Sequence, residues 1–450
     1  MAKVYFVSLG CDKNLVDTEV MLALLAESGH TITDDENEAD VIVVNTCAFI
    51  HDAKQESIDT ILEMADLKKN GHLKGIVATG CLAERYSSEI RLDLPEVDVI
   101  VGTASYEKIA LAVDDVLKSK KTEYLLDKDT PATVHGKRFL SKLGFSAGLK
   151  IAEGCSKRCT YCAIPYIRGN YRSVKMEDVV SEAKVLAEKG IKELVLVAQE
   201  TTCYGIDIYG KKMLPELLRE LSKIDGIEWI RILYCYPEEI TDELIKEMAT
   251  NPKVCHYLDM PVQHASDRIL RAMGRRTTRS EITERIAALR KAIPDIVLRT
   301  TVMVGFPGET DEDFKDLYNF IDETEFDRLG AFAYSPEEGT PAYLMEGQVD
   351  EDVKASRLDE IMILAQEISE EKNETKIDKE YEVLIEGTLP EGDDEDPDIT
   401  VYVGRTYGDA PDVDGFFFVK SYAKHITGDK IRAVVTDVTE YDLYGNEIIC

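Results

Sequence analysis

The sequence predicts an α/β protein in three parts: an N-terminal parallel α/β domain, a central partial TIM-type (β/α) barrel, and a small antiparallel β-barrel at the C-terminal end. Continuous apolar runs rich in Val and Ile alternate with amphipathic helical segments as far as residue 376. Short alternating strands separated by Gly, Asp and Pro follow from there. A cysteine array also follows the first strand of the central part. We therefore place the parts at residues 1–140, 141–376 and 377–450.

In the N-terminal part, strand-like runs alternate with helical ones. Because the β-branched runs are continuous, they indicate a parallel sheet with helices on both faces. The chain from Thr122 to Ser141, which contains Pro131 and Gly136, is typical of a linker. We expect strands at Val4–Val7, Val41–Val44, Gly75–Ala78 and Val97–Val101, and helices at Glu19–Glu27, Ala53–Lys69 and from about Ala83.

Three cysteines of this part, Cys11, Cys47 and Cys81, each follow a predicted strand. In an open α/β sheet these strand ends lie along one edge, which is where ligands bind. A single free cysteine is usually a small buried apolar side chain. Three at equivalent positions favour the ligands of an iron–sulfur cluster with an open fourth site.

The central part repeats strand and helix about six times, which predicts a parallel barrel or part of one with its site at the C-terminal face. We expect strands at Leu149–Ala152, Glu193–Ala198, Trp229–Tyr234, Tyr257–Pro261, Val297–Val304 and Arg328–Tyr334. We expect helices at Met176–Glu188, Leu214–Lys223, Asp242–Met248, Arg279–Ala292 and Asp311–Ile321.

A C-x3-C-x2-C array, Cys155, Cys159 and Cys162, opens the loop after the first of these strands. Three thiolates hold three irons of a cubane cluster and leave the fourth iron free for another molecule. A zinc site needs a fourth ligand, and no histidine is near in the sequence. An odd number of close cysteines does not pair into disulfides.

With Tyr161 directly before its last cysteine, the array resembles the signature of the radical S-adenosylmethionine enzymes. The resemblance implies that the open iron binds the methionine moiety of S-adenosylmethionine (SAM). Polar residues at later strand ends are then candidate SAM contacts: Gln199, Glu200, Gln263 and Gly305. Gly305 fits a tight turn equally well, and Gln263 also fits a satisfied polar group at a loop entrance.

The last quarter of the chain begins with a helical pattern, Asp350–Lys376, and continues with short strands of a small β-barrel. From residue 377 onward there are 18 acidic and six basic residues, and Glu391–Asp398 alone carries six acids. A surface that binds nucleic acid is normally basic, so we expect no direct tRNA binding here.

Composition points to a cytoplasmic protein. There is no apolar run long enough to cross a membrane and no signal peptide pattern. Ten cysteines without a secretory signal favour a reducing compartment and metal ligation. The formal net charge of −33 repels phosphate and attracts basic proteins.

The order of the three parts resembles that of the radical SAM methylthiotransferases over nearly the full length. Stretches such as S-L-G-C-D-K-N-L-V-D-T-E-V-M and Y-V-G-R-T-Y-G-D-A-P are most similar to the branch that modifies a ribosomal protein. Asp12 stands where that pattern has proline and Ala48 where it has glycine, and neither change removes a ligand.

The resemblance implies two [4Fe–4S] clusters, a C-terminal TRAM barrel, and transfer of a methylthio group to the β-carbon of an aspartate. The implied substrate is the decoding-centre protein of the small ribosomal subunit, and the implied electron donor is a reductase or flavodoxin-type protein. A tRNA-adenosine methylthiotransferase would share every ligand. A non-enzymatic iron–sulfur protein, for electron transfer or redox sensing, would hold the clusters without cleaving SAM.

Overall fold

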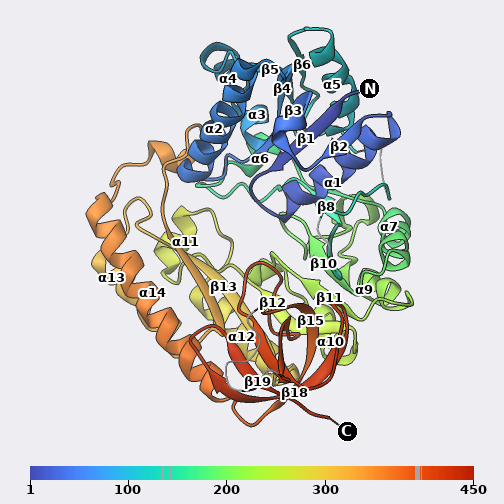
Figure 1. Ribbon diagram of the computed structural model, residues 1–450. Coiled ribbons are helices and arrows are strands. Elements are labelled where there is room, and N and C mark those ends of the chain that lie inside the picture. The colour runs from blue at the N-terminus through green and yellow to red at the C-terminus, as the bar shows by residue number, and fades with distance from the viewer. Residues whose placement is uncertain (133–135, 142–143, 391–395, 397, 450) are drawn as a thin grey trace.

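The computed structural model describes residues 1–132, 136–141, 144–390, 396 and 398–449. Three large sheets follow one another along the chain and through the molecule: the N-terminal sheet, the central sheet and the C-terminal barrel (Figure 1). Among the described residues, no helix is both long and apolar enough to cross a membrane.

The N-terminal sheet has six parallel strands in the order β2-β1-β3-β4-β5-β6, with apolar cores on both faces. The strands are β1 (Lys3–Ser8), β2 (Thr31–Thr33), β3 (Val41–Thr46), β4 (Gly75–Gly80), β5 (Val97–Val101) and β6 (Thr122–Tyr124). The helices are α1 (Asp12–Glu27), α2 (His51–Asp66), α3 (Cys81–Arg85), α4 (Ser87–Asp93) and α5 (Ile109–Leu117).

Three features of this sheet differ from the sequence prediction. Helix α1 begins at Asp12 rather than Glu19, because its first two turns bury polar residues such as Asn14 and Asp17 that carry no apolar periodicity. The edge strand β2 was not predicted. Strand β6 pairs with β5 where a linker was expected to start, so the connection begins after Tyr124.

The central sheet is an open arc of six parallel strands in the order β14-β13-β12-β11-β10-β7, with helices on its outer face (Figure 1). Its strands are β7 (Ser146–Lys150), β10 (Glu193–Val197), β11 (Trp229–Ile232), β12 (Val254–Asp259), β13 (Val297–Val304) and β14 (Arg328–Ala333). Its helices are α6 (Ile164–Ile167), α7 (Met176–Glu188), α8 (Ile206–Tyr209), α9 (Leu214–Ser222), α10 (Asp242–Thr250), α11 (Asp267–Ala272), α12 (Arg279–Ala292) and α13 (Asp311–Thr324).

The first central strand begins and ends earlier than predicted. Strand β7 ends at Lys150, and Ala152–Glu153 form a separate strand, β8, which pairs antiparallel with β9 (Arg172–Ser173). The cysteine array therefore lies in the connection between these two strands. Helices α6, α8 and α11 were not predicted because none exceeds six residues.

Helix α14 (Glu351–Glu374) leads from the central part into a closed five-stranded barrel. The barrel strands are β15 (Glu380–Thr388), β16 (Thr400–Arg405), β17 (Phe417–Ser421), β18 (Lys430–Val438) and β19 (Leu443–Glu447). Four neighbouring pairs are antiparallel, and β17 with β19 is parallel. Most of the predicted acidic run, residues 391–395 and 397, lies outside the described residues.

Short 3-10 helices complete the chain at Glu36–Glu38, Leu67–Asn70, Tyr106–Lys108, Pro237–Glu239 and Pro341–Leu344. The barrel docks on the central sheet through buried charge. Glu193, at the first position of β10, accepts hydrogen bonds from Arg231 (2.7 Å) and from Arg405 of the barrel (2.8 Å). All three side chains are fully buried.

Candidate active site

A pocket of about 460 Å³ lies between the N-terminal part and the C-terminal ends of the central strands. Its wall is mostly apolar and aromatic, with residues from both parts. Four of the six candidate ligand cysteines line it: Cys11, Cys47, Cys81 and Cys162. The N-terminal group and the central array therefore border one shared pocket, which sequence reasoning did not predict.

The N-terminal cysteines come from three adjacent strands of the sheet. Cys11 follows β1 and precedes α1, Cys47 follows β3, and Cys81 is the first residue of α3 after β4. Gly10 has a φ of +89°, and a Cβ there would lie 3.0 Å from the Cβ of Cys47 and 3.1 Å from its Sγ. Only glycine permits this approach of the Cys11 loop to Cys47.

The central array is held in a tight loop against the rest of the central part. Cys155 donates its backbone N–H to the carbonyl of Gly169 (3.1 Å). Gly154 has a φ of +76°, and a Cβ there would lie 2.1 Å from the carbonyl oxygen of Asn170. The Sγ of Cys159 lies 3.4 Å from the hydroxyl of Tyr236.

The donor chemistry of both groups fits iron–sulfur clusters. Burial raises the pKa of Cys81 and Cys155 to about 11 and that of Cys162 to about 12. Thiols in such surroundings keep their protons until a metal replaces them. Within the described part of the chain, no three His, Cys, Asp or Glu side chains converge on a single ion. A cubane does not require that convergence, because each thiolate binds a different iron.

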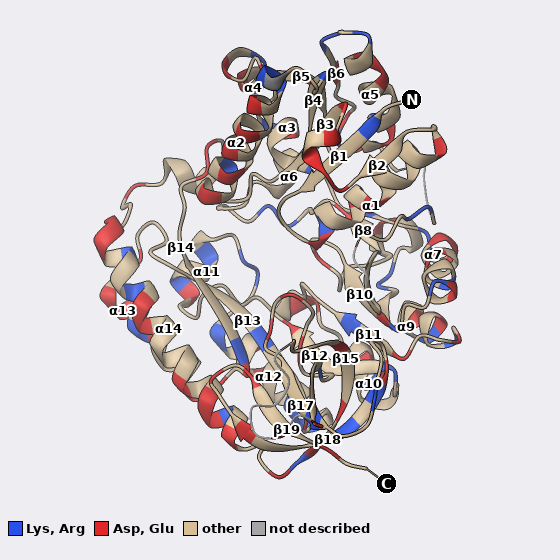
Figure 2. Cartoon of the chain, viewed as in Figure 1, with Lys and Arg blue, Asp and Glu red and all other residues tan. Residues whose placement is uncertain are grey.

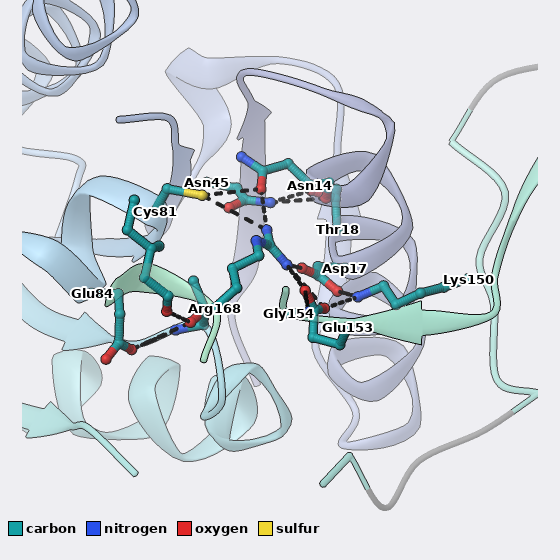
Figure 3. A network of polar contacts seen from close by, with 12 residues as sticks. Asn14, Asp17, Thr18, Asn45, Cys81, Glu84, Lys150, Glu153, Gly154 and Arg168 are labelled. Atoms are coloured by element: carbon teal, nitrogen blue, oxygen red, sulfur yellow. Dashed lines mark hydrogen bonds and ion pairs between the residues drawn. The ribbon is translucent and has the colours of Figure 1, made fainter. Parts of the chain in front are cut away.

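A buried arginine connects the two cysteine loops (Figure 3). Arg168 donates to Asn14 (2.5 Å) and Asp17 (3.0 Å) of α1, and to both oxygens of Glu153 (3.1 Å each). Its Nη2 also lies 3.8 Å from the Sγ of Cys81. Since Glu153 precedes Cys155 by two residues, one guanidinium bridges a residue of each candidate cluster site.

Comparison with known proteins decides the family. Residues 149–321 match the radical SAM superfamily, residues 3–102 match "Uncharacterized protein family UPF0004", and residues 377–448 match the TRAM domain. The chain is 54% identical over 443 residues to the ribosomal protein uS12 methylthiotransferase RimO of Lachnoclostridium phytofermentans, covering 98% of this chain and 99% of that protein. It is 50% identical over 452 residues to RimO of Clostridioides difficile, covering 99% of each. The chain belongs to the RimO family of methylthiotransferases.

Solved structures share the fold at low identity. The radical SAM methyltransferase TsrM of Kitasatospora setae superimposes with a TM-score of 0.56 at 14% identity, covering 76% of each chain. The family makes this protein an enzyme that uses SAM and two [4Fe–4S] clusters, as expected from the sequence. The alternative of a non-enzymatic electron carrier or redox sensor was wrong.

Of the four candidate SAM contacts, two lie at the pocket of this RimO-family enzyme. Gln199 and Gln263 both line it, and each has a side-chain oxygen with no partner among the described residues. Gln199 also donates to Glu153 (2.8 Å). Gln263 has a φ of +69°, so its backbone is held in a strained turn at the pocket.

The other two candidates are not among the residues that line the pocket. Glu200 is buried and accepts a hydrogen bond from the backbone N–H of Thr202 (2.9 Å), and burial raises its pKa to about 7. Gly305 has a φ of +72° and donates its N–H to Glu309 (2.9 Å), which is the tight turn considered from the sequence.

Sequence reasoning missed Arg168, Lys13 and Arg275, which all line the pocket. The arginine and lysine side chains gave no periodic or spacing signal. Asp17, a partner of Arg168, and Tyr234, the partner of Lys13, are each more than 100 residues away in the chain.

Proposed function

We propose that this enzyme adds a methylthio group to the β-carbon of an aspartate in the small-subunit ribosomal protein uS12. The observation that carries the proposal is the shared pocket. A carbon placed in it lies between both cysteine groups, as a reaction that joins SAM cleavage to sulfur transfer requires. The names of the RimO relatives supply the substrate protein.

In this proposal Cys155, Cys159 and Cys162 hold the cluster that binds SAM, and Cys11, Cys47 and Cys81 hold the second cluster. When bound, these cofactors would supply radical abstraction of the substrate hydrogen and the sulfur and methyl group that replace it. The three parts at residues 1–140, 141–376 and 377–450 act as separate domains, the first two contributing one cluster each.

The chain's own residues bind, orient and exclude water. Gln199 and Gln263 offer unpaired amide oxygens, which suit the ammonium of the methionine moiety. Glu200 and Gly305 act on the same cofactor through the loops that they stabilise. Apolar side chains such as Ile164 and Met303 keep water from a reactive radical.

The outer surface suits a basic protein substrate. Acidic residues, coloured red, are prominent along α2, α7, α13 and α14 (Figure 2). The barrel region carries three acidic residues for each basic one. Such a surface attracts the Lys- and Arg-rich uS12 and repels tRNA. We place the reaction in the cytoplasm, with electrons from a reductase or flavodoxin-type protein and no direct contact with tRNA.

The test is anaerobic turnover of the enzyme with both clusters reconstituted, followed by mass spectrometry. One reaction receives a decoding-loop peptide of uS12 and another receives unmodified tRNA. We expect the mass of one methylthio group on the peptide's aspartate, with no product from tRNA. A Cys81→Ala variant should yield no methylthio product.

Two results would contradict this proposal in different ways. Modified tRNA with untouched peptide would mean that the acidic surface does not set the substrate. Methylthio transfer to the peptide by Cys81→Ala would mean that the N-terminal cysteines do not hold the second cluster.

A further inference from the structure

The pocket is cationic although the protein is strongly acidic. Three cations, Lys13, Arg168 and Arg275, line it together with a single carboxylate, Glu337. Glu337 is paired with Lys54 (3.1 Å) and Arg85 (2.7 Å) of the N-terminal part. Apart from its cysteines, the lining of the pocket therefore has a net positive charge to offer to a bound anion.

The three cations differ in whether a carboxylate is paired with them. Arg168 is paired with Asp17 and Glu153. Lys13 has Asp12 and Cys11 among its charged neighbours, and Arg275 has Glu238. Among the described residues, neither cation is seen in a close ion pair with a carboxylate like those of Arg168. Burying a charge without a counter-charge is costly, so an unpaired cation in a binding pocket points to an anionic ligand.

Lys13 lies on the side of the pocket formed by the N-terminal cysteines. It is two residues after Cys11, at the start of α1, and only 8% of the residue is exposed. Its Nζ lies 3.2 Å from the centre of the Tyr234 ring, which covers it from the end of β11. This contact holds the ammonium in place without neutralising it.

Arg275 belongs to the opposite side, near the central cysteine array. Its guanidinium stacks 4.0 Å from the ring centre of Tyr236, whose hydroxyl lies 3.4 Å from the Sγ of Cys159. It also donates to the carbonyl of Pro261 (2.8 Å). The two unpaired cations therefore lie at opposite cysteine groups, Arg275 on the SAM side and Lys13 on the sulfur side.

We propose that Lys13 binds the side-chain carboxylate of the aspartate that is modified, and so selects an acidic substrate residue. This inference rests on the proposed function. The reacting carbon has to lie between the two cysteine groups, and its carboxylate is one bond away. An ammonium on the sulfur side turns the β-carbon toward the SAM side, where its hydrogen is removed. A nucleobase has no anionic group at this position, so Lys13 discriminates against tRNA as well.

The experiment is a mutant cycle on binding, with both clusters present, SAM added and no reductant, so that no turnover occurs. A fluorescent decoding-loop peptide carries either aspartate or the isosteric asparagine at the target position. The wild-type enzyme should bind the aspartate peptide at least about tenfold more tightly, because a charge-assisted hydrogen bond exceeds a neutral one. In Lys13→Met the ratio of the two dissociation constants should fall to about one.

Two further variants separate charge from structure. Lys13→Arg keeps the cation and should retain most of the preference for aspartate, whereas Lys13→Gln should lose it. Lys54→Met is the matched control, because this lysine is already paired with Glu337. It should keep the wild-type ratio. Iron content is measured for each variant, so that loss of a cluster is seen directly.

An unchanged ratio in both Lys13→Met and Lys13→Gln would overturn the inference. Weaker SAM binding with an unchanged ratio would assign Lys13 to the cofactor instead, and loss of iron with an unchanged ratio would assign it to charge balance at Cys11. Failure of the proposed function has a different signature. In that case the wild-type enzyme under reducing conditions leaves the aspartate peptide unmodified, whatever the Lys13 variants bind.

Discussion

Two networks of buried charge join the parts of this enzyme, one at each end of the central strands. At the C-terminal ends, Arg168 connects α1 with Glu153 and approaches Cys81. At the N-terminal ends, Glu193 lies between Arg231 and Arg405 of the barrel. Both networks are almost completely shielded from water.

The two networks differ in what lies beside them. The Arg168 network borders the pocket and a candidate cluster ligand, so its geometry is part of the site. Among the described residues, the Glu193 network contacts only the barrel and the central sheet. Buried charge therefore has two roles in this protein. At the C-terminal ends of the central strands it orients residues of the site, and at their N-terminal ends it holds the barrel against the central sheet. Mutations in the two networks separate these roles.

The largest effect is expected from Arg168→Met. It leaves the carboxylates of Asp17 and Glu153 with one cation, Lys150, in a buried site. We expect a loss of about 3–5 kcal/mol in the free energy of unfolding, measured by urea titration. We also expect about a 10- to 100-fold loss of methylthio transfer, because groups that orient metal ligands have effects of that size.

Arg168→Lys is the control for this variant. It keeps the charge but loses the planar fork that reaches Asn14, Asp17 and Glu153 together. The free energy of unfolding should return most of the way to the wild-type value. The reduction potential of the second cluster should differ from that of the wild type in both Arg168→Met and Arg168→Lys. If Arg168→Met kept the reduction potential and the activity of the wild type, the network would have only a structural role.

Glu193→Gln should be next in size and should act on stability alone. It leaves Arg231 and Arg405 buried without their shared carboxylate, at a cost of about 3 kcal/mol in unfolding free energy. Iron content and turnover per folded molecule should equal those of the wild type. A loss of turnover in the folded variant would mean that the barrel end also positions the site.

Acid should weaken the same network in the wild-type enzyme. Burial alone would raise the pKa of Glu193, but Arg231 and Arg405 lower it to about 2. Its stabilising effect is therefore complete above the ordinary glutamate pKa and is lost as pH falls from there toward 2. Between pH 7 and pH 3, the stability gap between the wild type and Glu193→Gln should narrow by about 2 kcal/mol, measured by urea titration at each pH. A gap independent of pH would contradict this pairing.

The smallest effect is expected from Ser146→Ala. The Ser146 hydroxyl donates to Glu193 (2.6 Å) and accepts from Arg405 (3.0 Å). Its loss leaves both ions paired with each other, so unfolding free energy should fall by about 1 kcal/mol. Thermal unfolding followed by circular dichroism measures this. A loss as large as that of Glu193→Gln would mean that the hydroxyl, rather than the ion pairs, organises the interface.

Much of the fold was accessible from sequence because local signals agreed with the final packing. The bounds of β13, α7 and α12 equal the predicted ranges. Helix α12 even carries a complete capping box between Thr278 and Glu281. The three-residue edge strands β2 and β6 were missed because they have too few residues to show a period, and their partners lie in other parts of the chain.

The sequence indicated the cysteines of the site, through their spacing and strand-end positions, and two polar residues at strand ends that line the pocket, Gln199 and Gln263. Arg168 and Asp17 are 151 residues apart, and Lys13 meets Tyr234 only after two domains pack together. Such contacts depend on tertiary geometry, which a single sequence does not encode in any local pattern. The common pocket was missed for the same reason.

The two cysteine groups also differ in how far apart their members are in the chain. Cys155, Cys159 and Cys162 lie within one short loop. Bringing their thiols together therefore requires closure of only a short segment of chain, which costs little conformational entropy. Cys11, Cys47 and Cys81 come from three strands and meet only when that parallel sheet has formed. Non-local pairing of this kind is slow to form. Iron uptake by the proposed N-terminal group therefore has to follow folding, whereas the central loop gathers its thiols with little of the fold in place.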